Sequence, residues 1–282
     1  MRQSGSIANL NESFSTEPEK IYPIKYVEIQ SCGKLYEQWK EHDKFYTDAP
    51  NDGFNFNVKY VDTKNYIDYD EFTPTVLALH GAPGSHKDYI PLISRLLPEN
   101  VRVIAPDFPD YSATDRTKYF RHRVEEKSHY LRDFLNALNV KKSVGIFQNL
   151  NSFSTFHSKY SLVIIKIYSL RFRIDLVVTH SSACYPGLSL PKQEDAPSVR
   201  SYCLINPAGH RRIIAMKPKW FVDNVVRVYL NPFTRAVFRK IGSYILAAKG
   251  VPVKTDNVDN VVLSATTMFY ARPELVSQIL FF

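Results

Sequence analysis

The sequence predicts an α/β fold in which a mostly parallel β-sheet carries helices on both faces. Short runs of apolar residues, each about the length of a buried strand, recur along the chain. Stretches with apolar residues at helical spacing separate these runs. Loops rich in glycine and proline end two of the runs abruptly. Strands that are apolar throughout and alternate with helices are typical of a parallel sheet buried on both sides.

The composition is that of a globular protein of 282 residues, with 44% hydrophobic and 23% charged residues, which excludes disordered and fibrous classes. Cys32, Cys184 and Cys203 include no Cys-x-x-Cys pair, so we expect free thiols in a reducing compartment. The first twenty residues have no apolar run of the kind that a secretory signal needs. The longest apolar run, residues 160–170, is interrupted by a lysine and is shorter than the ~20 residues that cross a bilayer. We therefore expect a cytoplasmic protein.

Positive charge is concentrated in the C-terminal part of the chain. The net charge is +8, and the residues from Arg200 onward hold 12 of the 36 basic but only 4 of the 28 acidic residues. Such asymmetry makes residues 200–282 a candidate surface for an anionic partner or a membrane. The basic residues alternate with aromatic and aliphatic ones and never exceed two in a row, which favours a solvated helical surface over a nucleic-acid site. The sequence leaves the oligomeric state open.

The elements follow in order from a flexible tail at residues 1–24. Four elements are expected in the first half: an alternating strand at 55–62, a buried strand TVLAL at 75–79, a helix at 88–97 and a buried strand at 101–105. The second half begins with a helix at 124–140 and buried strands IDLVV at 174–178 and YCLI at 202–205. Four helical segments follow, at 219–230, 233–248, 258–270 and 273–282. This order predicts an α/β core over residues 25–207 and a lid-like helical region over 208–282.

Two strand ends carry the residues suited to chemistry, since ligands of such sheets bind at the carboxyl ends of the strands. TVLAL leads into His80-Gly81-Ala82-Pro83-Gly84, and IDLVV leads into Thr179-His180-Ser181-Ser182-Ala183. A nucleophilic serine on a sharp strand-to-helix turn needs small residues two positions before and after it. Ser181 meets this requirement, whereas Ser182 would place the bulky His180 in the crowded position.

These motifs give the chain a resemblance to a known family. LHGAPGSH at residues 79–86 and THSSAC at residues 179–184 resemble the α/β-hydrolase superfamily, especially nematode-type members with LHGAPGSH and GHSRGC-like segments. The resemblance runs from about residue 55 to the end of the chain. It implies an α/β-hydrolase fold with a helical lid and hydrolysis of a small or lipid-like, apolar ester or amide without a cofactor.

The resemblance also implies roles for individual residues. Ser181 would be the nucleophile, and the backbone N–H groups of Ala82 and Ser182 would form the oxyanion hole. The loop His80, Gly81, Pro83 and Gly84 would shape the site, with His80 either bonded to its own loop or recruited as a base. Epoxide hydrolases and dehalogenases share His-Gly-x-Pro but use an aspartate at the elbow, where this chain has serine. Nothing in the sequence has the ligand spacing of a metal site or the glycines of a phosphate loop.

Three departures from the family pattern predict impaired activity. Thr179 replaces the glycine two positions before the serine, and Pro186-Gly187 should shorten or break the following helix. The only histidine after Ser181 is His210, and the sequence stops where the family adds its last strands, which indicates a truncated hydrolase. We expect poor or no ester hydrolysis unless His80 or His210 replaces the missing base. The alternative is a non-catalytic, hydrolase-like protein that binds a ligand or partner, so the sequence alone leaves enzymatic activity open.

Residues 144–173 are predicted to be a foreign insertion. In the family the elbow strand follows within a few residues of the helix ending NALNVKK, and joining residue 142 or 143 to Ile174 restores that spacing. The segment is rich in Phe, Ile, Ser, Tyr and Lys, as a translated AT-rich intron would be. The alternative is that residues 144–147 form a strand and the remainder is a genuine excursion.

Overall fold

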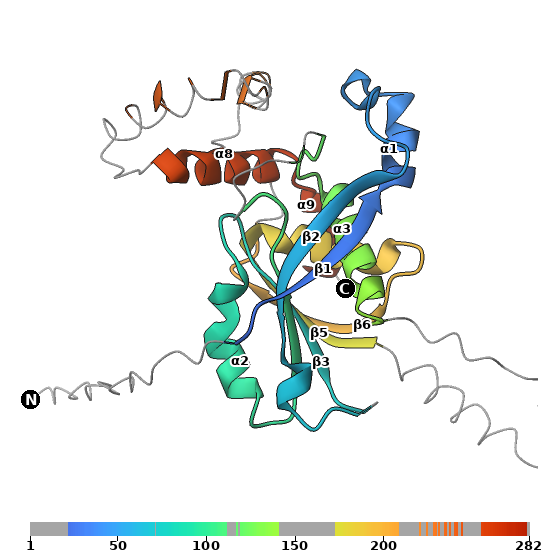
Figure 1. Cartoon of the computed structure of the whole chain (residues 1–282), viewed down its shortest axis with the longest axis vertical. Helices are drawn as coiled ribbons and strands as arrows, with labels where there is room; N and C mark the ends of the chain where they lie inside the picture. The colour runs from blue at the N-terminus through green and yellow to red at the C-terminus, as the bar shows by residue number, and fades with distance from the viewer. Residues whose placement is uncertain are drawn as a thin grey trace, which may run out of the picture.

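A six-stranded sheet with order β1-β2-β4-β3-β5-β6 forms the centre of the protein, shown in Figure 1 as a computed structural model. The structure describes residues 22–70, 72–111, 117, 119–140, 173–208 and 255–280, with a few single positions between 220 and 244. The strands are β1 Lys25–Cys32, β2 Gly53–Asp62, β3 Thr75–Leu79, β4 Arg102–Pro106, β5 Arg173–His180 and β6 Ser198–Ile205. The α-helices are α1 Gly33–Lys40, α2 Ile90–Leu96, α3 Val124–Ala137, α5 Cys184–Ser189, α8 Thr255–Phe269 and α9 Pro273–Leu280. Single 3-10 turns are η1 Lys44–Tyr46, η2 Thr63–Tyr66, η3 His86–Tyr89, η4 Ser181–Ala183 and η5 Leu190–Lys192.

The predicted mostly parallel α/β sheet is confirmed. β4, β3, β5 and β6 are parallel neighbours, while β2 pairs antiparallel with both β1 and β4. In the register of β3 with β5, Leu79 lies opposite Thr179, so the two predicted motifs leave the sheet side by side. None of the helices in the described part of the chain is long and apolar enough to span a bilayer.

The pleat of the central strands divides the core into two halves. Leu77 and Ile104 pack on the face covered by α3, whereas Val76 and Val103 pack on the opposite face with Ile93 of α2. Figure 1 shows α2 and α3 on opposite sides of the sheet. Because both faces are covered, residues 76–79 and 103–105 of these strands are all apolar, which is why the sequence pattern revealed them.

The segment between β1 and β2, which contains α1 and η1, is joined to the rest of the core through a buried carboxylate. Glu126 at the start of α3 accepts hydrogen bonds from the hydroxyls of Tyr36 (3.1 Å) and Tyr46 (3.3 Å). It also accepts the backbone N–H groups of Arg121 (3.0 Å) and Arg123 (2.8 Å). The Glu126 side chain is fully buried, and this burial raises its pKa to about 7. One carboxylate therefore fixes α1, η1 and the first turn of α3 together.

Several predicted boundaries were wrong. The helix expected at 124–140 ends at Ala137, because Asn139 adopts a left-handed φ of 56° and Val140 N–H bonds back to Leu135 O in a C-terminal cap. The strand expected at 202–205 begins earlier, at Ser198. The tail expected to reach residue 24 is already packed at Tyr22, which is 4% exposed and contacts Ser94 through its hydroxyl.

Other predictions are only partly covered by the described residues. α8 and α9 confirm the last two predicted helical segments in approximate position. The proposed insertion at 144–173 lies outside the described residues except for Arg173, which starts β5, so it stays a prediction. β1 and α1 were not predicted individually, because the eight residues of β1 alternate only weakly in polarity.

Candidate active site

Ser181 lies on a sharp turn directly after β5. Its backbone φ is 52°, in the left-handed region that residues other than glycine rarely adopt. The chain then continues through η4 into the short helix α5. Ser182 has no such conformation and is only 3% exposed. The strained turn therefore falls on the serine that the motif spacing favoured.

The loop after β3 approaches this turn closely at Gly81. A Cβ atom on Gly81 would lie 3.1 Å from Ser181 Cβ and 2.9 Å from His180 Nδ1. This close approach follows from the parallel pairing of β3 and β5, whose carboxyl ends are adjacent. The structure thus brings Gly81 of the His80–Gly84 loop next to Ser181. Glycine at position 81 leaves the space in which the serine turn packs.

Thr179 and Gly187 fit together, which accounts for two of the departures noted in the sequence. Thr179 is fully buried at the end of β5, and a Cβ on Gly187 would lie 2.9 Å from its methyl group. Glycine in α5 therefore makes room for the branched side chain of Thr179. The helix stays intact through Pro186-Gly187 but ends at Ser189, so the predicted shortening is confirmed and a break is not.

His80 is held by hydrogen bonds at both ring nitrogens. Its Nε2 accepts the backbone N–H of Phe108 at 2.8 Å, so Nδ1 carries the proton and donates to Gly81 O at 2.7 Å. The ring is 1% exposed, and burial lowers the pKa of His80 to about 4. With no free lone pair, His80 is unsuited to act as a general base, and its role is to connect the loops after β3 and β4.

We expect the His80 ring to remain neutral down to about pH 5. In the unfolded chain its pKa returns to about 6.5, so the unfolded state binds more protons between pH 4 and 6.5. His80 therefore contributes stability that is complete above pH 6.5 and is lost as the pH falls, by up to about 3 kcal/mol. The shift of Glu126 acts in the opposite sense over an overlapping range, so unfolding should be compared in a Glu126→Gln background. NMR titration of the His80 ring gives the direct measurement, and a midpoint near 6.5 would contradict the expected result.

Two buried histidine–carboxylate pairs lie beside β4 and its following loop. His86 donates its backbone N–H (2.6 Å) and Nδ1 (2.9 Å) to Asp107 Oδ1, and His122 Nε2 lies 3.1 Å from Asp110 Oδ2. Asp107 therefore holds η3 beside the loop that follows β4. His210 lies outside the described residues.

A buried lysine between α3 and α8 was missed by the sequence reasoning. Lys127 is 3% exposed, and its Nζ donates to Thr267 Oγ1 at 3.1 Å. Burial lowers its pKa to about 7. Tyr111 donates or accepts a hydrogen bond with the same threonine at 2.7 Å. In the sequence Lys127 looks like any solvated helical lysine, and only the packing of α8 places it inside.

Comparison with known proteins agrees with this arrangement. Residues 39–150 match the family model described as "Alpha/beta hydrolase of unknown function (DUF1057)". Over this stretch, which is less than half of the chain, the sequence is similar to that family. The match includes β3, its His80–Gly84 loop and β4, whereas Ser181 lies beyond it. No curated protein matches the chain in sequence.

Solved α/β-hydrolase structures give weaker likenesses. A thermophilic esterase from Thermogutta terrifontis is 14% identical, with 90% of this chain and 75% of that chain covered and a TM-score of 0.47. A probable hydrolytic enzyme from Pseudomonas aeruginosa PAO1 is 17% identical, with 92% and 67% covered and a TM-score of 0.44. A haloalkane dehalogenase from Agrobacterium tumefaciens C58 is 13% identical, with 88% and 67% covered and a TM-score of 0.42. At such identities and TM-scores, the activities of those proteins are not transferred to this chain.

Proposed function

We propose that this chain is an α/β hydrolase with a serine-type site at Ser181 for a small or lipid-like ester or amide, and that its activity is strongly impaired. The observation that carries the proposal is the left-handed φ of Ser181 at the end of β5, packed against Gly81. A strained turn of this kind presents a serine hydroxyl at the edge of the sheet. The backbone N–H groups of Ala82 and Ser182 are the proposed oxyanion donors.

The proposed impairment rests on the state of the histidines. A serine hydroxyl is a weak nucleophile until a neighbouring base accepts its proton. His80, in the loop that packs against Ser181, uses both ring nitrogens for structural hydrogen bonds and has no lone pair left to accept this proton. This state favours, as the second candidate function, a hydrolase-like protein that binds a ligand or partner without turnover.

Turnover of p-nitrophenyl butyrate by the purified chain tests the proposed impairment. We expect a rate no more than roughly 10³–10⁴-fold above that of the uncatalysed reaction in water. This is the residual acceleration of a site whose triad is incomplete. This residual rate comes from the oxyanion hole and substrate binding, so Ser181→Ala should leave it nearly unchanged. The matched variant Ser182→Ala should also retain it because its backbone N–H is unchanged. A fluorophosphonate probe followed by peptide mapping then reports whether Ser181 is the reactive serine.

Three outcomes separate the alternatives. Rapid turnover that both Ser181→Ala and His210→Ala abolish would contradict the impairment and identify His210 as the base. Labelling that survives Ser181→Ala would contradict the proposed nucleophile. Absence of both labelling and residual turnover in the parent chain would favour the non-catalytic binder.

A further inference from the structure

Strand β2 has a free edge where it separates from β4. The two strands pair only from Tyr60 to Asp62, and the last contact beyond them is Asp107 N–H to Lys59 O at 2.8 Å. Backbone groups alternate sides along a strand, so the N–H and C=O of Asn57 and Asn55 point the same way as those of Lys59. Within the described part of the chain, no strand pairs with β2 on this side before Tyr60. The backbone N–H and C=O groups of Asn55 and Asn57 are therefore available to pair with another strand.

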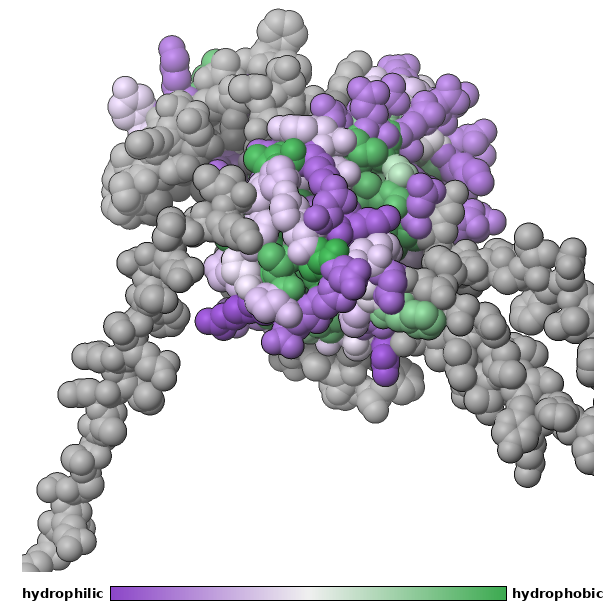
Figure 2. Space-filling view, turned by 60° about the horizontal axis from the view of Figure 1, so that its bottom comes forward, coloured by the Kyte–Doolittle hydropathy of each residue, from purple (hydrophilic) through white to green (hydrophobic). Residues whose placement is uncertain are grey.

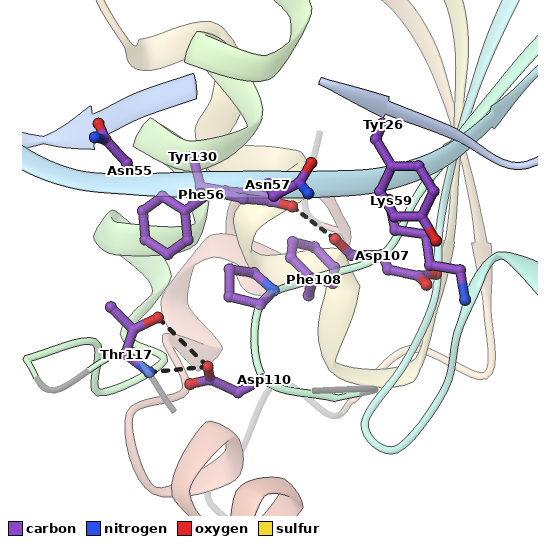
Figure 3. Close-up of a pocket in the computed structure, with 11 residues that line it drawn as sticks. Tyr26, Asn55, Phe56, Asn57, Lys59, Asp107, Phe108, Asp110, Thr117 and Tyr130 are labelled. Atoms are coloured by element: carbon purple, nitrogen blue, oxygen red, sulfur yellow. Dashed lines mark hydrogen bonds between the residues drawn. The ribbon is translucent and has the colours of Figure 1, made fainter. Parts of the chain in front are cut away.

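A cavity of about 410 Å³ lies along this free edge (Figure 3). This volume falls within the roughly 300–1,000 Å³ of ligand sites. Four aromatic residues line it, and Tyr130 lies 5.3 Å from Phe56 and 6.3 Å from Phe108 between ring centroids. The cavity thus combines an apolar lining with the unpaired backbone of β2.

The wall across from β2 leaves those backbone groups without a partner. It is formed by Pro109, which has no N–H, and by Asp110 and Thr117. Thr117 donates both its N–H (3.1 Å) and its hydroxyl (3.4 Å) to Asp110 Oδ1, as the dashed lines in Figure 3 show. The polar groups of this wall are thus bonded to each other.

Asp107 gives one end of the cavity a hydrogen-bond acceptor. Asp107 is 6% exposed. Its Oδ2 has no hydrogen-bond partner in the described part of the chain, whereas its Oδ1 accepts two hydrogen bonds from His86. Burial alone would raise the pKa of Asp107, but the hydrogen bonds from His86 hold it below its usual value. The carboxylate therefore stays ionised and can only accept. Figure 3 shows it directed toward the side of the cavity where Lys59 and Tyr26 stand.

We propose that the cavity beside β2 binds a short extended peptide, which adds as a strand to the edge at Asn55 and Asn57 and places a basic or hydroxyl side chain at Asp107. Exposed strand edges recruit peptides through main-chain hydrogen bonds, and pockets along the edge select the side chains. The backbone groups of Asn55 and Asn57 repeat about every 6.8 Å, the spacing of alternate residues in an extended peptide. A sugar or other polyol has no such repeat. A single small cation would use Asp107 alone and leave the β2 edge unpaired.

The test uses isotope-labelled protein and the N-acetylated, C-amidated pentapeptide Thr-Val-Lys-Val-Thr. We expect the peptide to shift the backbone amide NMR signals of Asn55 and Asn57. The same peptide with N-methyl groups on both valines lacks the two N–H donors of the peptide edge that would face β2, and it should bind at least about tenfold more weakly. This comparison needs no change to the protein.

Two substitutions of Asn57 distinguish the contribution of its backbone N–H to peptide binding from that of its side chain. Asn57→Pro removes the N–H that faces the cavity and leaves the β1 ladder in place, so peptide affinity should fall about tenfold or more. Asn57→Ala keeps that N–H, and its affinity should stay within about threefold of the parent. Circular dichroism and the amide spectrum confirm that both variants are folded.

The proposal is overturned if the pentapeptide leaves the Asn55 and Asn57 amides unshifted at millimolar concentration, or if its N-methylated form binds equally well. Equal affinity of the folded Asn57→Pro variant would overturn it too. Glucose serves as the polyol probe, and shifts of the same amides by glucose but not by peptide would assign the cavity to a polyol instead.

Discussion

Replacing Glu126 by alanine should lower the free energy of unfolding by about 3–5 kcal/mol. The substitution leaves the hydroxyls of Tyr36 and Tyr46 and the N–H groups of Arg121 and Arg123 without their acceptor inside the protein. An unsatisfied buried polar group costs about 1–3 kcal/mol, and some of these groups will recover water. Urea unfolding followed by intrinsic fluorescence measures the loss, which is a large part of the roughly 5–15 kcal/mol of a typical domain.

Two variants control this measurement. Glu125→Ala removes the neighbouring carboxylate, which forms a partly exposed ion pair with Arg272, and should cost less than about 1 kcal/mol. Glu126→Gln retains one acceptor oxygen and should fall between the two. A Glu126→Ala protein as stable as Glu125→Ala would show that this carboxylate does not hold α1 and η1 to α3.

The contribution of Glu126 to the free energy of unfolding should change with pH in a defined direction. The folded pKa of Glu126, about 7, lies above its unfolded value of about 4.5. Proton binding therefore stabilises the folded chain most below pH 4.5, and this contribution is lost as the pH rises through about 7. In the Glu126→Gln variant that loss should be absent, which leaves the opposite trend of His80.

Gly53→Ala should lower the free energy of unfolding by about 3 kcal/mol or more. Gly53 starts β2 with a φ of 81°, and a Cβ there would lie 1.9 Å from Ser31 O and 2.6 Å from Gly33 N. Both are backbone atoms of the β1–α1 junction, and Gly53 itself pairs with Cys32 of β1, so the collision cannot be relieved by a rotamer change. Strain at a positive φ and overpacking each cost about 1–3 kcal/mol.

Thermal unfolding measures this effect, with an expected fall of the midpoint by roughly 6–12 °C. The adjacent exposed variant Asp52→Ala should change the midpoint little. A Gly53→Ala midpoint within experimental error of Asp52→Ala would mean that the β1–α1 junction yields easily, and that the edge of β2 is less firmly placed than described above.

The sequence by itself determined the central strands and the position of the serine turn. TVLAL and IDLVV are apolar except for Thr75 and Asp175, because helices cover both faces of the sheet, so a local pattern was enough to find them. The small residues around Ser181 likewise indicated a sharp turn, since the crowding that excludes bulky neighbours acts between residues close in sequence. Parallel pairing then required the loops after these two strands to meet.

Only the tertiary structure decided what the polar residues do. His80 became a structural residue because Phe108, 28 positions away, donates to its Nε2. Thr179 was tolerated because Gly187 across the turn leaves room for its methyl group. Glu126 and Lys127 look like ordinary surface charges on a helix, yet one meets α1 and η1 and the other meets α8. Partners distant in sequence set these roles, because hydrogen bonding and burial depend on which elements pack together. Local periodicity in the sequence indicates only which face of an element is apolar.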